Sequence, residues 1–73
     1  MNMMNMIKRG DIVKANMGYK KQITKGELYE VIFVNHYHII IKDNKEKEDE
    51  FPMVWFIYDI VANRDKIIYD ILK

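Results

Sequence analysis

Two neighbouring stretches decide the fold, LYEVIFV at residues 28–34 and YHIIIK at residues 37–42. Both are rich in β-branched and aromatic residues, which favour extended backbone over helix. In the first stretch one alternating set is Leu28, Glu30, Ile32 and Val34, and the other is Tyr29, Val31 and Phe33. Because both sets are mostly apolar, we predict a central strand that is covered on much of both faces. Asn35 and His36 mark a short turn, so the two stretches are predicted to pair as a hairpin.

A further strand is predicted on the N-terminal side of this hairpin. Residues Ile12–Ala15 follow a turn at residues 10–11 and have the apolar, β-branched character of a short strand. Residues 16–21 show no hydrophobic period and contain Gly18, which indicates a loop. A second break at residues 24–26 ends the loop before the hairpin begins.

The chain after the hairpin predicts one more turn and one more strand. Residues 43–45 favour a turn because Asp and Asn tolerate left-handed backbone. The charged stretch that follows leads to Pro52, which lacks an amide donor and therefore breaks a strand or lies at an edge. Residues 53–56 are predicted to form one tight helical turn, and residues 57–61 a last strand.

The C-terminal residues predict a short amphipathic helix. Asn63 is a good N-cap, which places the helix at residues 64–73. One side of that helix carries Ile67, Ile68, Ile71 and Leu72. An alternative start at Asp59 adds two apolar residues to the same face. So short a helix must pack on something, and three uses stay open: capping the domain, pairing with a second copy, or docking on a partner.

Length and composition limit the chain to one small domain. It has 73 residues and no cysteine, which excludes a disulfide scaffold and zinc sites that need thiolates. The formal net charge is only +1, so no global field attracts nucleic acid or membrane. The charge is nevertheless segregated: residues 8–25 hold six basic residues and one acid, and residues 27–50 hold seven acids and three lysines.

Two segments of the sequence resemble a known family. The first is KRGDIV at residues 8–13 with ITKGELYEV at residues 23–31, and the second is IIIKDN at residues 39–44 with EFP and a later Phe at residues 50–56. The order "G-D-x-V, loop, G-x-x-Y-x-V" is similar to small SH3-like barrel proteins of phages and low-GC, Bacillus-type bacteria. The resemblance covers residues 8–61.

That resemblance and the strand pattern together define the expected architecture. We expect a mostly β protein, a small SH3-like barrel of about five antiparallel strands with a short C-terminal α-helix. The expected division is a flexible N-terminus at residues 1–6, the barrel at residues 7–62, and the amphipathic helix at residues 63–73. Twelve Ile against two Leu, and ten Lys against two Arg, are typical of AT-rich coding and agree with such a source.

Residue types that carry enzymatic chemistry are scarce. The chain has no Ser or Cys, and its one Thr has no predictable base beside it. The three glycines are too dispersed for a phosphate loop. His36 and His38 share a face if both are extended, but a metal site needs further ligands that the sequence does not place. We therefore predict no catalytic residues, no metal and no cofactor.

Aromatic and basic residues supply the candidate binding surface. Trp55 and Tyr58 are predicted to be half exposed, whereas Phe51 and Phe56 are predicted to lie in the core. The predicted partner-binding set is Tyr19, Lys20, Lys21, Lys25, Trp55 and Tyr58. Its lysines have three possible roles: a solvated loop, a docking surface for an acidic protein, or contacts to nucleic-acid phosphates.

The function that these features predict is a non-enzymatic protein-binding module. The resemblance implies a small phage-type accessory factor that binds a host protein, as an inhibitor or other modulator. The first alternative is a nucleic-acid-binding barrel that uses the basic region from Lys8 to Lys25, and the second is a structural or self-associating subunit, such as a homodimer. The absence of a signal-like or membrane-spanning stretch predicts a cytoplasmic location, in the host cell if phage-encoded, and no membrane partner.

Overall fold

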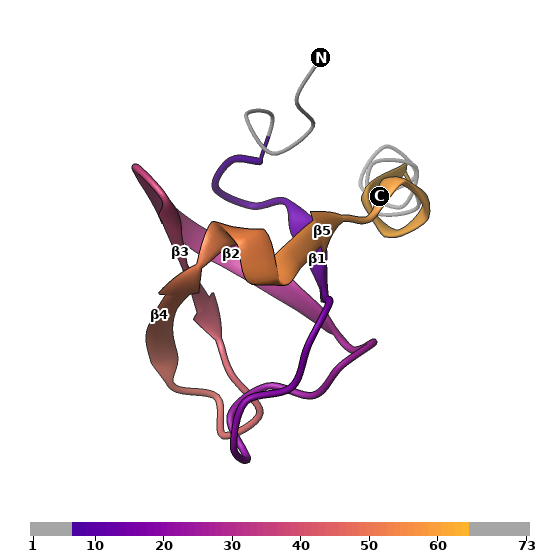
Figure 1. Ribbon diagram of the computed structural model, residues 1–73. Helices are drawn as coiled ribbons and strands as arrows, with labels where there is room; N and C mark the ends of the chain where they lie inside the picture. The colour runs from indigo at the N-terminus through magenta and orange to yellow at the C-terminus, as the bar shows by residue number, and fades with distance from the viewer. Residues whose placement is uncertain (1–6, 65–73) are drawn as a thin grey trace.

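Five strands form one antiparallel sheet in the computed structural model of the chain, which describes residues 7–64 (Figure 1). The strands are β1 (Ile12–Ala15), β2 (Leu28–Asn35), β3 (His38–Lys42), β4 (Glu48–Pro52) and β5 (Phe56–Tyr58). A short 3-10 helix, η2 (Met53–Trp55), lies between the last two strands. The prediction of a small, mostly β domain with antiparallel strands is therefore confirmed.

The order of the strands is β4-β3-β2-β1-β5, so β4 and β5 are the two edges of the sheet. Consecutive strands from β1 to β4 pair with their neighbours, and β5 returns to pair with β1. In the described part of the chain no pairing joins β4 to β5, so the sheet is open and the predicted closure into a barrel is not observed. Figure 1 shows η2 carrying the chain from the β4 edge to the β5 edge.

The hairpin of β2 and β3 forms where the sequence predicts it, but one of its faces is less covered than expected. The register shifts between Val31 and Phe33, which inserts one extra residue into β2. This bulge reverses the alternation, so Tyr29, Val31 and Val34 all contact the core. Leu28 and Phe33 are 47% and 55% exposed. The prediction that both faces of this strand are largely covered is wrong, because no other element within residues 7–64 covers its outer face.

The hydrophobic core lies on the inner face of the curved sheet. Its buried members are Ile7, Val13, Ala15, Ile23, Tyr29, Val31, Ile39, Ile41, Phe51, Met53 and Phe56. They come from every strand, from η2, and from the loops before and after β1. The predicted burial of Phe51 and Phe56 is confirmed, and Trp55 and Tyr58 are partly buried beside them, as expected.

Pro52 and η2 explain how the chain passes from one edge of the sheet to the other. Pro52 is the last residue of β4, an edge strand, where a missing N–H breaks no ladder between two strands. The N–H of Met53 donates to the carbonyl of Tyr37 at 2.8 Å, which holds the start of η2 against the hairpin. The predicted helical turn before the last strand is therefore confirmed. The predicted bounds of that strand, residues 57–61, are wrong, because β5 is Phe56–Tyr58 and residues 60 and 61 already belong to the C-terminal helix.

The C-terminal helix begins earlier than our preferred start. Residues 60–64 are already helical, and Asp59 Oδ1 accepts the N–H of Ala62 at 2.8 Å in the manner of an N-cap. Asn63, the predicted cap, lies in the first turn and bonds to β1 instead: Oδ1 accepts the N–H of Ile12, and Nδ2 donates to its carbonyl. The alternative start at Asp59 is the correct one, because the tertiary contact withdraws Asn63 from capping.

Some predicted features lie outside the described residues. They are the N-terminal segment 1–6 and the helix face of Ile67, Ile68, Ile71 and Leu72. The helix face therefore stays a prediction, together with its three possible uses. Within residues 7–64, no helix has the length and apolar character that crossing a bilayer requires.

Candidate functional site

Three aromatic side chains gather beside η2 and form what we call the aromatic cluster: Tyr19, Phe51 and Trp55. The ring centroids of Tyr19 and Trp55 are 5.4 Å apart, and those of Phe51 and Trp55 are 6.0 Å apart. Phe51 lies in the core, whereas Tyr19 is 38% exposed. The cluster therefore extends from the core to the surface, and Tyr19 and Trp55 pack on the buried ring of Phe51.

Backbone hydrogen bonds explain why residues from separate segments meet in this cluster. The N–H of Asn16 donates to the carbonyl of Trp55 at 2.7 Å, which fastens the loop after β1 to η2. Tyr19 and Ile23 then form an isolated β-bridge, which closes a tight turn.

Within that turn Lys20 has a φ of 50°, a left-handed conformation that few non-glycine residues adopt. Its ammonium group lies 5.3 Å from the centre of the Tyr19 ring, within reach of a cation–π contact.

A second loop, between β3 and β4, is bound to the first one through Asn44. The backbone N–H of Asn44 donates to the carbonyl of Gln22 at 2.7 Å. Its side-chain Nδ2 donates to the carbonyl of Lys21 and to Oγ1 of Thr24, at 3.2 and 3.0 Å. Its Oδ1 accepts the hydroxyl of Tyr29 at 2.8 Å. One asparagine thus joins two loops that are distant in sequence, and Figure 1 shows these loops side by side.

Joining the two loops creates a basic pocket of about 370 Å³. We call it the lysine pocket, and its lining residues are Lys20, Lys21, Gln22, Asp43, Lys45 and Lys47. The four lysines are exposed, whereas Asp43 is only 5% exposed. Lys45 and Lys47 come from the segment that the sequence marks as acidic, so their contribution is visible only in the folded chain.

The structure brings together some of the predicted partner-binding residues and separates others. Tyr19, Lys20 and Trp55 belong to the aromatic cluster or contact it, and Lys21 lines the lysine pocket. Lys25 is exposed in a neighbouring turn and does not line that pocket. Tyr58 lies on β5 opposite Val13 and packs partly buried against the core. Four of the six predicted residues therefore form one candidate site, and Lys25 and Tyr58 are outside it.

The basic residues before β1 and on β1 are also separate from this site. The ammonium group of Lys8 lies 3.5 Å from the carboxylate of Asp11, and that of Lys14 lies 3.8 Å from the carboxylate of Asp59. Arg9 lines a different pocket. The basic stretch that the sequence offers as one nucleic-acid surface is thus divided among several places in the fold.

Asp43, which lines the lysine pocket, and Asp49 form an acidic pair that the sequence does not predict. Asp43 Oδ1 accepts the N–H groups of Lys45 and Lys47, at 2.8 and 3.0 Å. Its Oδ2 is buried and has no hydrogen-bond partner in the described part of the chain. A hydrogen bond between the carboxyl groups of Asp43 and Asp49 lowers the pKa of Asp43 below its ordinary 3.8 and raises the pKa of Asp49 above it. Asp49 also accepts Gln22 Nε2 at 3.0 Å, which connects the pair to the first loop.

This pair predicts a pH-dependent stability, and Asp49→Asn removes the part of it that comes from the titration of Asp49. The lowered pKa of Asp43 stabilises the fold above that pKa, and the contribution is lost as pH falls through it. The raised pKa of Asp49 does the reverse, because its contribution is lost as pH rises through that pKa. An amide at position 49 donates to Asp43 at every pH. We therefore expect Asp49→Asn to gain stability relative to the wild type as pH rises through the pKa of Asp49, measured by urea midpoints.

Glu48→Gln is the matched control, since it removes one carboxylate from the neighbouring, exposed position of β4. Its stability difference from the wild type should change little across the same pH series. A difference between Asp49→Asn and the wild type that is constant with pH would show that the two carboxyl groups share no proton.

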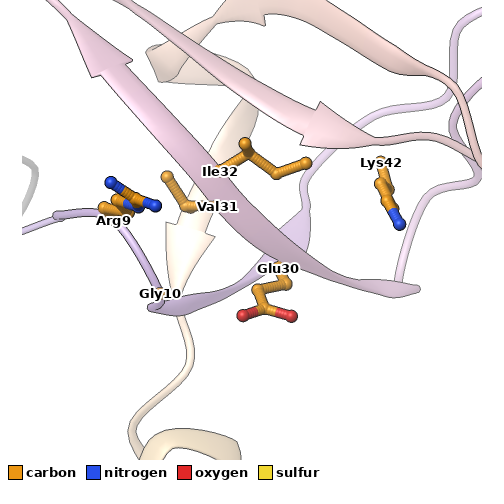
Figure 2. A pocket seen from close by; sticks show the side chains of 6 residues that line it. All are labelled: Arg9, Gly10, Glu30, Val31, Ile32 and Lys42. Carbon is orange, nitrogen blue, oxygen red and sulfur yellow. The ribbon is translucent and has the colours of Figure 1, made fainter.

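A second pocket, of about 260 Å³, lies beside β2 and is lined by Arg9, Gly10, Glu30, Val31, Ile32 and Lys42. Figure 2 shows Arg9 and Lys42 at opposite ends of this pocket and Glu30 between them along β2. The charges around it are therefore mixed in sign and do not converge on one point. A ligand of either charge would therefore meet both attractive and repulsive side chains in this pocket. The lysine pocket, in contrast, presents mainly positive side chains.

The histidines do not form part of a larger cluster. His38 Nδ1 lies 4.0 Å from Glu50 Oε2 across the β3–β4 pair, and the His36 ring lies beside that of Tyr37 in the hairpin turn. Among residues 7–64, no three His, Cys, Asp or Glu side chains are placed to hold a metal ion.

The chain was compared with known families, curated proteins and solved structures. No family model, no curated protein and no solved structure matches this chain.

Proposed function

We propose that this protein is a non-enzymatic protein-binding module whose binding site is the aromatic cluster with the neighbouring lysine pocket. The observation that carries the proposal is the contact of Tyr19 and Trp55 at the surface, with the ammonium group of Lys20 over the Tyr19 ring. Partly exposed Trp and Tyr side chains that are supported by a core are the residues that most often anchor protein interfaces.

The lysines beside the cluster favour a partner with an acidic surface. Long-range attraction of opposite charges mainly increases the association rate and selects the partner, whereas the apolar anchors supply most of the affinity. In this site Trp55 and Tyr19 are the anchors, and Lys20 and Lys21 steer the approach.

The fold supports the SH3-like assignment that the sequence resemblance suggests. The strand order, with β5 beside β1 and a 3-10 helix between β4 and β5, agrees with an SH3-like arrangement whose sheet is left open. The resemblance to phage proteins extends the proposal: a small accessory factor that binds a protein of a low-GC bacterial host and modulates it.

Affinity capture from a lysate of such a host tests the proposal. We expect the wild-type protein to retain a specific partner that Trp55→Ala and Tyr19→Ala lose, because each substitution removes an anchor from the cluster. Loss of an interface anchor of this kind costs about 2 kcal/mol or more, a roughly thirtyfold weaker binding.

Val54→Ala is the matched control, since Val54 precedes Trp55 in η2 and is 65% exposed. This variant should retain the partner, and circular dichroism should show that all three variants remain folded. Equal recovery of the same partner by the wild type and by Trp55→Ala would contradict the proposed site.

A further inference from the structure

Lys20 connects the aromatic cluster to the lysine pocket. Its ammonium group lies 5.3 Å from the centre of the Tyr19 ring, and its side chain also lines the pocket. A ligand that fills the pocket therefore extends directly onto the cluster. We propose that the occupant is an acidic peptide segment of the partner, with an apolar side chain on Tyr19 and Trp55 and its carboxylates among the lysines. This inference rests on the proposed function and specifies the partner's chemistry.

The charges of the pocket fit this occupant. Four exposed ammonium groups surround the opening, whereas the one carboxylate in the lining, that of Asp43, is buried. The Asp43 carboxylate is held within the protein: Oδ1 accepts the N–H groups of Lys45 and Lys47, and Oδ2 is buried. An arriving anion thus meets the lysines and not the aspartate, so the charges are complementary to carboxylates.

The extent of the basic surface favours a short peptide segment over a nucleic acid. The positive surface is short, because exposed Glu46 lies between Lys45 and Lys47 and the next exposed residues along β4 are Glu48 and Glu50. The rings of Tyr19 and Trp55 pack on each other at 39°, which leaves them less suited to stacking successive bases. A long polyanion needs a continuous basic groove, whereas a short acidic segment needs only the pocket.

The backbone of the first loop holds Lys20 in a left-handed conformation. Its φ of 50° costs a non-glycine residue free energy. Glycine adopts this conformation freely. Lys20→Gly therefore removes the side chain without adding strain, so a loss of binding in this variant reports on the lysine side chain.

Two synthetic peptides test the inference, with the fluorescence of the single tryptophan, Trp55, as the reporter. One is a short glutamate-rich peptide with a central leucine, and the other has alanine in its place. We expect the leucine peptide to bind about tenfold more tightly, because it buries an aliphatic side chain on the cluster. Its affinity should fall as salt is added, since the lysine contacts are screened.

Charge reversal locates the carboxylate contacts. The double variant Lys45→Glu/Lys47→Glu and the variant Lys20→Gly should lose most of the binding. The matched control is Lys25→Glu/Lys42→Glu, which changes the net charge equally at exposed lysines outside the pocket. The control should bind nearly as well as the wild type, and thermal unfolding should show that both double variants are folded.

Three outcomes overturn the inference: equal binding of the two peptides, equal losses in the two double variants, or tighter binding of single-stranded oligothymidine than of either peptide. The lysate experiment separates this inference from the proposed function. If Lys45→Glu/Lys47→Glu retains the captured partner while Trp55→Ala loses it, the protein-binding function stands and the acidic segment is wrong. If Trp55→Ala also retains the partner, the proposed site itself fails.

Discussion

Phe56→Ala is expected to remove a large fraction of the stability of the fold. The side chain is 2% exposed, and its ring lies 6.3 Å from that of Tyr29 and 6.2 Å from that of Phe51. Truncating a buried phenylalanine costs about 3–5 kcal/mol, because transfer free energy is lost and a cavity is left. A domain of this size has a stability of only about 4–11 kcal/mol, at 0.05–0.15 kcal/mol per residue. Thermal unfolding should therefore shift by on the order of 20 °C.

Ile57→Ala is the control for this prediction, because Ile57 is the next residue of β5 and is 53% exposed. It removes an aliphatic side chain from the outer face of the same strand and should change the unfolding temperature by only a few degrees. Similar losses in the two variants would mean that the core is not on the inner face of the sheet. Trp55→Ala, one residue before Phe56, should stay folded but lose the binding partner. Phe56→Ala should instead lose stability, so the two variants distinguish binding from folding.

The second large effect is expected at Asn63, which is 5% exposed and joins the C-terminal helix to β1. Its Oδ1 accepts the N–H of Ile12 at 2.7 Å, and its Nδ2 donates to the carbonyl of the same residue at 2.8 Å. Asn63→Ala leaves these partly buried groups without their partner, at a cost of about 2 kcal/mol. Urea unfolding should show this as a lower midpoint with an unchanged slope.

Asn63→Asp gives this prediction a second, independent readout. A carboxylate still accepts the N–H of Ile12 but faces its carbonyl with no donor, unless the carboxyl group is protonated. Folding therefore raises the pKa of the new carboxyl group, and the stability of this variant should fall as pH rises through that pKa. Arg64→Ala, at the exposed neighbouring position, should show no such dependence. A pH-independent Asn63→Asp variant would contradict the hydrogen-bonding geometry.

Much of the fold could be predicted from the sequence, because the residues that specify each of these features are neighbours in the chain. The β-branched hairpin, the turn at Asp43 and the edge position of Pro52 each depend on neighbouring residues, and all three are observed. The bulge near Ile32 was not predicted, because an inserted residue leaves no mark in an alternating pattern whose two sets are both apolar. Asn63 was misassigned as a cap, since a cap and a tertiary hydrogen-bonding residue have the same side chain.

The candidate site was predicted only in part, and the residues that were missed share one cause. Tyr19, Lys20 and Trp55 were expected because of their residue types. Lys45 and Lys47 were not, since they lie in a segment with more acids than lysines, and only the bridge made by Asn44 brings them to Lys20 and Lys21. Lys25 was expected in the site because it is near in sequence, yet the turn directs it elsewhere.

The sequence alone determined the extended segments, their turns, the large aromatic side chains and the lack of Ser and Cys nucleophiles, because each depends on composition or on neighbours within a few positions. Only the tertiary structure determined that the loop after β1 contacts the turn after β3. The open sheet places the turns after β1 and β3 at one end, and hydrogen bonds of Asn44 hold them there. Contacts between segments more than twenty residues apart depend on the path of the whole chain, and no local pattern encodes them.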